Sequence, residues 1–93
     1  MRATEVIPDH INEATIDGVI IRKGTVAAFL INARTINDPH STLDDRQSAF
    51  HDIEEAIPAL NALGLFEILE VRSPQIRSFV DQRMSGSSEI DCQ

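Results

Sequence analysis

The sequence contains no tryptophan and no tyrosine, and its only aromatic side chains are four phenylalanines. Carbohydrate-binding surfaces, cages for methylated ammonium groups and platforms for single-stranded nucleic acid rely on aromatic stacking, so these functions are disfavoured. Because large aromatic side chains are scarce, the core is expected to be mainly aliphatic. A domain of 93 residues forms one core with little stability to spare, so association with a second chain would help it.

Cysteine and long apolar runs are also nearly missing. Cys92 is the only cysteine, so no disulfide can form within the chain and an oxidising compartment is not indicated. The sequence shows neither the apolar segment of a secretion signal nor a run near the ~18 apolar residues that cross a bilayer. We therefore expect a cytoplasmic protein that has no membrane partner.

Basic residues are few: Lys23 is the only lysine, and the formal net charge is -7. The charge is concentrated between residues 38 and 70, where eight acidic residues stand against Arg46 alone, while both flanks are balanced. Phosphate backbones are bound by clusters of Lys and Arg, so direct binding to nucleic acid is not expected. The acidic segment either keeps the protein soluble and apart from its copies or attracts a basic protein partner.

The clearest pattern that is present is the spacing of apolar residues over 42–63, which predicts one long helix with a broad apolar face. Ser41 or Thr42 can cap its start, and Gly64 suits the left-handed position that ends a helix. Pro58 lacks the N–H that a helix interior needs, so we expect a kink there or a division into two helices.

Shorter patterns predict the other elements of a small α+β domain. Asp17-Gly18 suits the tight turn of a hairpin near residues 14–22, and Gly24-Thr25 precedes a helix over about 25–37. Residues 65–71 are largely apolar and are expected to form a strand, while residues 4–7 can form a further short strand before a proline. A last helix is predicted over 74–84 after Ser73-Pro74. We thus predict a short sheet packed by three helices in a single domain over residues 1–84, followed by a mobile tail over 85–93.

Arg22, Lys23, Gly24 and Thr25 form a candidate anion-binding site. Two cations and a glycine lead directly into a helix N-terminus, where free N–H groups and the helix dipole attract a phosphate or a carboxylate. The spacing is not that of a P-loop, which needs a longer glycine-rich run. An ordinary turn between strand and helix, with solvated charges, explains the same residues.

His51 and Glu55 form a candidate metal site, because they are four residues apart on the exposed side of the long helix. Two ligands on one helix do not complete a site, and a solvated polar face is the simpler interpretation. We predict no cofactor. The sequence also lacks an obvious acid-base pair or an activated nucleophile, so enzymatic activity is not favoured.

Self-association is the function that the sequence favours most. Residues 26–31 are nearly all apolar, so this part of a helix is either enclosed within the domain or pressed against another molecule. Three arginines of the C-terminal third could face the acidic helix of a second copy, or the same groups could meet within one chain. We therefore predict a protein-interaction module that forms a homodimer; the alternative is a small-molecule or anion-binding domain, with or without enzymatic activity, at residues 22–25. The predicted interface residues are Val26, Phe29, Leu30, Ile31, Arg72 and Arg77.

Overall fold

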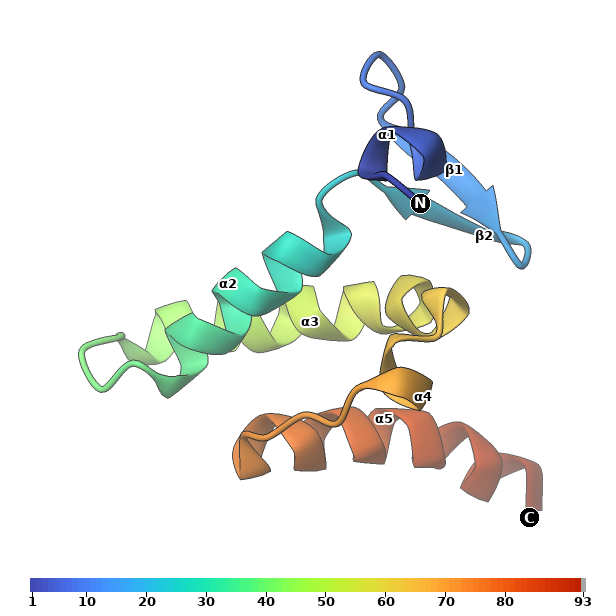
Figure 1. Ribbon diagram of the computed structural model, residues 1–93. Coiled ribbons are helices and arrows are strands. Elements are labelled where there is room, and N and C mark those ends of the chain that lie inside the picture. The colour runs from blue at the N-terminus through green and yellow to red at the C-terminus, as the bar shows by residue number, and fades with distance from the viewer. Residues whose placement is uncertain (93) are drawn as a thin grey trace.

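The computed structural model describes the backbone of residues 1–92 and the side chains of residues 1–84. The chain folds as a small α+β domain in which helices pack beside one two-stranded antiparallel sheet, as the sequence predicts (Figure 1). The elements in chain order are α1 (Ala3–Val6), β1 (Glu13–Ile16), β2 (Val19–Arg22), α2 (Thr25–Asn37), α3 (Leu43–Leu63), α4 (Leu65–Ile68) and α5 (Pro74–Cys92).

The predicted hairpin is confirmed. Asp17 and Gly18 both have positive φ, at 50° and 77°, which is the backbone that a tight turn between twisted strands requires. The strands pair from Glu13 opposite Arg22 to Ile16 opposite Val19. Ile21 is the one residue of the hairpin that is buried, and β2 packs against α3 near its C-terminal end. The hairpin and α1 therefore project from the helices rather than lying inside them (Figure 1).

Helices α2, α3 and α5 enclose the main core. α3 lies between the other two in the packing, and its residues Ile53 and Leu60 have no exposed surface. The Thr42 hydroxyl accepts a hydrogen bond from the Asp45 N–H, and Gly64 ends α3 with a φ of 81°, so both predicted caps are present. The buried cluster consists of Phe29, Ile36, Ala49, Ile53, Ile57, Leu60, Ile76 and Val80.

Pro58 does not divide α3 into two helices. The helix continues through it to Leu63, and the Pro58 ring lies on the exposed side while its neighbour Ile57 is buried. Glu54 loses the hydrogen bond that its carbonyl would accept from an N–H at position 58. The kink expected at this position stays a prediction.

Replacing Pro58 with alanine is predicted to stabilise the protein. Alanine restores the N–H and removes a ring that disfavours the helix interior by about 3 kcal/mol, although the freer unfolded chain offsets part of the gain. We expect the free energy of unfolding to rise by about 1–3 kcal/mol in urea titrations followed by circular dichroism. Unchanged or lower stability would mean that the proline shapes α3 so that Ile57 and Leu60 reach the core.

The strand predicted over residues 65–71 is wrong. Residues 65–68 form the short helix α4, and residues 69–73 belong to no helix or strand. Leu65 and Phe66 pack against the buried cluster from one helical turn, and the Phe66 ring meets the Phe29 ring edge to face at 6.1 Å. Since the hairpin lies elsewhere in the molecule, residues 1–92 provide no strand that pairs with this segment, and apolar composition alone does not make a strand.

Two further boundaries differ from the sequence prediction. Residues 3–6 form α1 instead of a strand, because the backbone N–H of Arg2 donates to Glu5 at 2.7 Å and closes a helical turn before Pro8. α5 begins at Pro74 as predicted and continues past Met84 to Cys92. Its later residues are poor helix formers, but they include no proline that would force an end. Mobility of residues 85–93 stays a prediction, and Gln93 lies outside the described residues.

The chain is more open than a closed domain of its length. Its Cα radius of gyration is 14.5 Å, whereas a compact chain of this size has a radius of roughly 12 Å. The hairpin projects at one side (Figure 1), and the molecule measures 40 × 36 × 21 Å along its principal axes, so it is flat instead of spherical. Much apolar surface on the outer helices therefore stays exposed.

Candidate interaction surface

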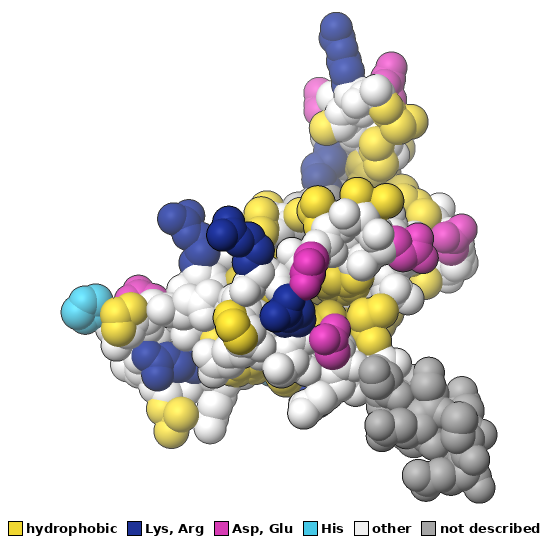
Figure 2. All heavy atoms as spheres, turned by 60° about the horizontal axis from the view of Figure 1, so that its bottom comes forward, with side chains coloured by type: hydrophobic (Ala, Val, Ile, Leu, Met, Phe, Trp, Pro, Cys, Tyr) yellow, Lys and Arg dark blue, Asp and Glu magenta, His cyan; other side chains and the backbone are white. Residues whose placement is uncertain are grey.

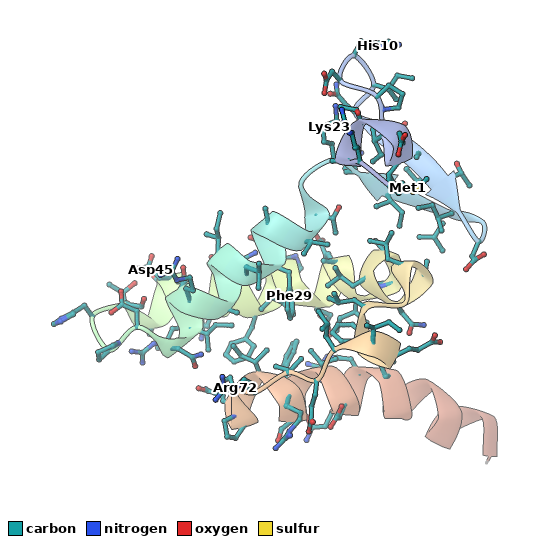
Figure 3. All side chains as sticks on the ribbon, in the orientation of Figure 1. Met1, His10, Lys23, Phe29, Asp45 and Arg72 are labelled. Carbon is teal, nitrogen blue, oxygen red and sulfur yellow. The ribbon has the colours of Figure 1, made fainter. Side chains whose placement is uncertain are left out.

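The residues of the predicted anion site lie together at the start of α2. Gly24 has a φ of 86° and turns the chain from β2 into the helix, and the Thr25 hydroxyl donates to the Arg22 carbonyl at 2.6 Å. The Lys23 ammonium group donates to the carbonyls of Pro8 and Asp9, at 2.8 Å and 3.0 Å. Figure 3 shows Lys23 beside α1, below the loop that carries His10. The charge of Lys23 thus already has backbone partners.

A hollow of about 410 Å³ lies beside these residues. It is bounded by α1, the hairpin, the start of α2 and Leu63 at the end of α3. Its walls are mostly apolar, with Ile7, Ile21 and Val26 among them, and all four residues of the predicted anion site contribute to its lining. Among the described residues that line the hollow, Arg22 is the one cation without a hydrogen-bond partner for its side chain, so anion binding stays a prediction.

Lys23 is predicted to hold the N-terminal segment on the hairpin. Replacing it with methionine keeps the length of the side chain but removes both hydrogen bonds to the loop. Each such bond is worth about 1 kcal/mol, so amide hydrogen exchange over residues 3–11 should accelerate by roughly five-fold or more. Exchange in α2 and α3 should be unchanged.

Arg22→Met is the matched control, because the Arg22 side chain makes no hydrogen bond or ion pair with the described part of the chain. It removes a neighbouring positive charge without removing a hydrogen bond or an ion pair among the described residues. Equal exchange rates in the two variants would show that the Lys23 contacts do not hold the N-terminal segment.

The predicted metal ligands His51 and Glu55 contact each other on the surface of α3. The His51 Nε2 lies 3.1 Å from a Glu55 carboxylate oxygen, and about two-thirds of each side chain is exposed. Within the described residues, no group of three or more potential ligands comes together. The pair is therefore a surface contact to which the described residues add no third ligand, and metal binding stays a prediction.

The predicted interface residues divide into an exposed set and an internal set. Val26, Leu30 and Ile31 are 38%, 55% and 64% exposed along α2. Phe29, by contrast, is buried, and its ring contacts that of Phe66 in α4. Figure 3 labels Phe29 where α2 passes over α3. The sequence could not separate Phe29 from its neighbours, because all of them are apolar and α2 is apolar on most of its sides.

The arginines are also divided. Arg77 forms an ion pair with Glu70. Arg83 pairs with Glu54 of α3 and lies over the Phe79 ring at 4.3 Å from its centroid. These two arginines therefore meet acidic groups within one chain, which is one of the two alternatives that the sequence allowed. Arg72 forms no ion pair with any of the side chains of residues 1–84.

An apolar groove of about 300 Å³ lies between α2 and the segment that joins α4 to α5. Leu30 stands on one wall and Leu69 on the other, and Leu69 is 59% exposed. Ile68, next to Leu69, is 82% exposed. The sequence prediction missed Ile68 and Leu69 because it placed them in a buried strand.

These residues define one candidate interaction surface. Figure 2, which brings the α5 side of the molecule forward, shows apolar side chains in patches over the middle of the protein, with basic and acidic side chains beside one another among them. A mixed surface of this kind suits a protein partner better than a nucleic acid or a lipid. The surface consists of the exposed groove residues Val26, Leu30, Leu69, Glu70 and Arg72, together with Ile31 and Ile68, which adjoin Leu30 and Leu69 in sequence.

Comparison with protein-family models, with curated proteins and with solved structures finds no match in any of the three. Among the described helices, none combines the length and the apolar character needed to cross a membrane. A functional assignment therefore has to be argued from the geometry of this chain.

Proposed function

We propose that this protein is a non-enzymatic interaction module whose main partner is a second copy of itself, and that it works in the cytoplasm. The observation that carries the proposal is the exposed apolar surface on both walls of the groove between α2 and the segment that joins α4 to α5. Leu30, Ile31, Ile68 and Leu69 are all more than half exposed. Leu30 and Leu69 line the groove, and Ile31 and Ile68 are their neighbours in sequence.

The energetic argument favours a partner on this surface. Full burial of one Leu or Ile side chain contributes about 1.5–3 kcal/mol, so covering several of them offsets much of the entropy lost on association. The core within one chain is small, with nine buried apolar residues among those that the structure describes. A chain that is this open gains stability when a second copy covers its exposed apolar side chains.

The acidic face of α3 supports a second, basic partner. Asp44, Asp52 and Glu55 are exposed, and the arginines that could neutralise the molecule are partly engaged, since Arg77 and Arg83 each have an acidic partner. A basic protein would be attracted to this face at low salt. This contact is separate from the apolar surface and would not compete with a homodimer.

The alternative function is binding of a small molecule, with or without catalysis, in the hollow beside residues 22–25. The volume of that hollow, about 410 Å³, is within the range of pockets that take small ligands, and this observation favours the alternative. Small-molecule binding is less well supported than the homodimer, because the Lys23 ammonium group, the strongest candidate for holding an anion, already donates hydrogen bonds to two backbone carbonyls.

Substitution of Leu30 with aspartate is predicted to weaken the dimer. The side chain is more than half exposed in a single chain, so the change costs little folding stability but places a charge in the interface. We expect at least a ten-fold weaker association, which corresponds to about 1.4 kcal/mol, in light scattering with refractive-index detection.

Leu43→Asp is the matched control, because Leu43 is 69% exposed at the start of α3 and does not line the groove. It introduces the same charge and should leave the mass in solution unchanged. If light scattering gives the same solution mass for Leu30→Asp and Leu43→Asp at every protein concentration, α2 does not form the interface.

A further inference from the structure

The segment that joins α4 to α5, residues 69–73, has an open backbone edge. Leu69 is extended, with φ −117° and ψ 144°. Among the described residues, the backbone N–H groups of residues 70–73 donate no hydrogen bond, and of the carbonyls over the same span only that of Ser73 accepts one, from the Arg77 N–H at 2.8 Å. An exposed stretch of free backbone groups is a site where another strand can add.

Over residues 70–73, exposed and half-buried side chains alternate as they would in a strand. Val71 packs against the core, and the Ser73 hydroxyl donates to the side-chain oxygen of Asn37 at 3.3 Å. Glu70 precedes Val71, Arg72 lies between Val71 and Ser73, and both Glu70 and Arg72 are exposed. Because successive side chains of an extended backbone point to opposite sides, Glu70 and Arg72 share the outer side.

The positions of Glu70 and Arg72 select one way of pairing with a second copy. Two antiparallel neighbouring strands related by a two-fold axis have that axis perpendicular to the sheet, so one residue lies opposite itself. An axis at Glu70 would place two carboxylates face to face, and an axis at Arg72 would do the same with two guanidinium groups. An axis at Val71 places Glu70 of each chain opposite Arg72 of the other, so two complementary pairs form.

We infer that residues 69–73 pair with the same residues of a second copy as an antiparallel two-stranded ladder centred on Val71. The inference rests on the proposed homodimer and specifies how its two chains meet. The free N–H and carbonyl groups of the segment gain partners across the two-fold axis, and Arg72, which has no acidic partner among residues 1–84, meets Glu70 of the other chain. Leu69 and Leu30 border the same groove, so the ladder also brings apolar surface of both chains together.

Charge-reversed variants test the register. E70R places two arginines opposite each other in both pairs, and R72E places two glutamates there, so each variant alone should associate roughly ten-fold more weakly than the natural chain. An equimolar mixture of E70R and R72E should form a heterodimer, because every pair across the axis is then complementary. The double variant E70R/R72E should form a homodimer for the same reason.

The dimers are identified by native mass spectrometry. The two single variants differ in mass, so their heterodimer has a mass distinct from that of either homodimer. Arg77→Gln is the control for the Glu70–Arg77 ion pair within one chain. It removes that pair and leaves residues 70 and 72 unchanged, so its dimer should persist.

Each outcome decides the inference. A natural chain that is monomeric at every concentration would overturn the homodimer and this ladder together. A dimer that is split by L30D but is indifferent to the charge reversals would leave the proposed function intact and overturn the ladder alone. Weak single variants that recover neither as a mixture nor as the double variant would also overturn it, because the effect would then arise within one chain. Selective binding of an extended peptide by a monomer would assign the open edge to a different partner and contradict self-pairing.

Discussion

Burial of one face of α3 is the constraint on which the rest of the structure depends. Ile53 and Leu60 have no exposed surface, and they are in the same cluster as Phe29 of α2 and Ile76 of α5. The helix can serve both neighbours because its apolar stripe is wide, including small residues such as Ala49 on its edge. Its length and position are in turn set by the Thr42 cap and by Gly64, which turns the chain directly into α4.

The same constraint explains why so much apolar surface remains exposed. α3 is covered by α2 and by α5, but within the described part of the chain the outer side of α2 and the segment after α4 keep exposed apolar side chains. The hairpin does not cover this surface. Its residue Ile21 is buried where β2 packs against α3, and the hairpin projects away from the helices (Figure 1). A second copy that covers the groove between α2 and the segment joining α4 to α5 would bury these exposed apolar side chains.

Most of the architecture could be predicted from the sequence because local signals agree with the packing. Asp17-Gly18 specified the hairpin, and apolar spacing with caps specified α2 and α3 within a residue of their ends. The strand over residues 65–71 failed because a short apolar run has no period that separates a strand from one helical turn, and the choice depends on whether a neighbouring strand exists. The backbone of Leu69 within the run is extended, but residues 69–73 belong to neither strand of the described sheet.

The candidate surface was only partly predictable. The sequence allowed residues 26–31 to be either enclosed within the domain or exposed to another molecule, and Leu30 and Ile31 are exposed. Phe29 is buried because it contacts Phe66, a residue distant in sequence. The same holds for the ion pair between Glu54 and Arg83, two residues separated by 29 positions. Contacts of this kind follow from how the helices cross, which no local pattern encodes.

The central claim, that the exposed surface is covered by a second copy, is tested most directly by sedimentation equilibrium of the natural chain with interference optics. These optics suit a protein without tryptophan or tyrosine. The account predicts a mass that rises with concentration from that of one 10.3 kDa chain to twice that value and then stays constant. A mass of 10.3 kDa from micromolar to millimolar concentration would contradict it and would leave the hollow beside Lys23 as the better candidate for function.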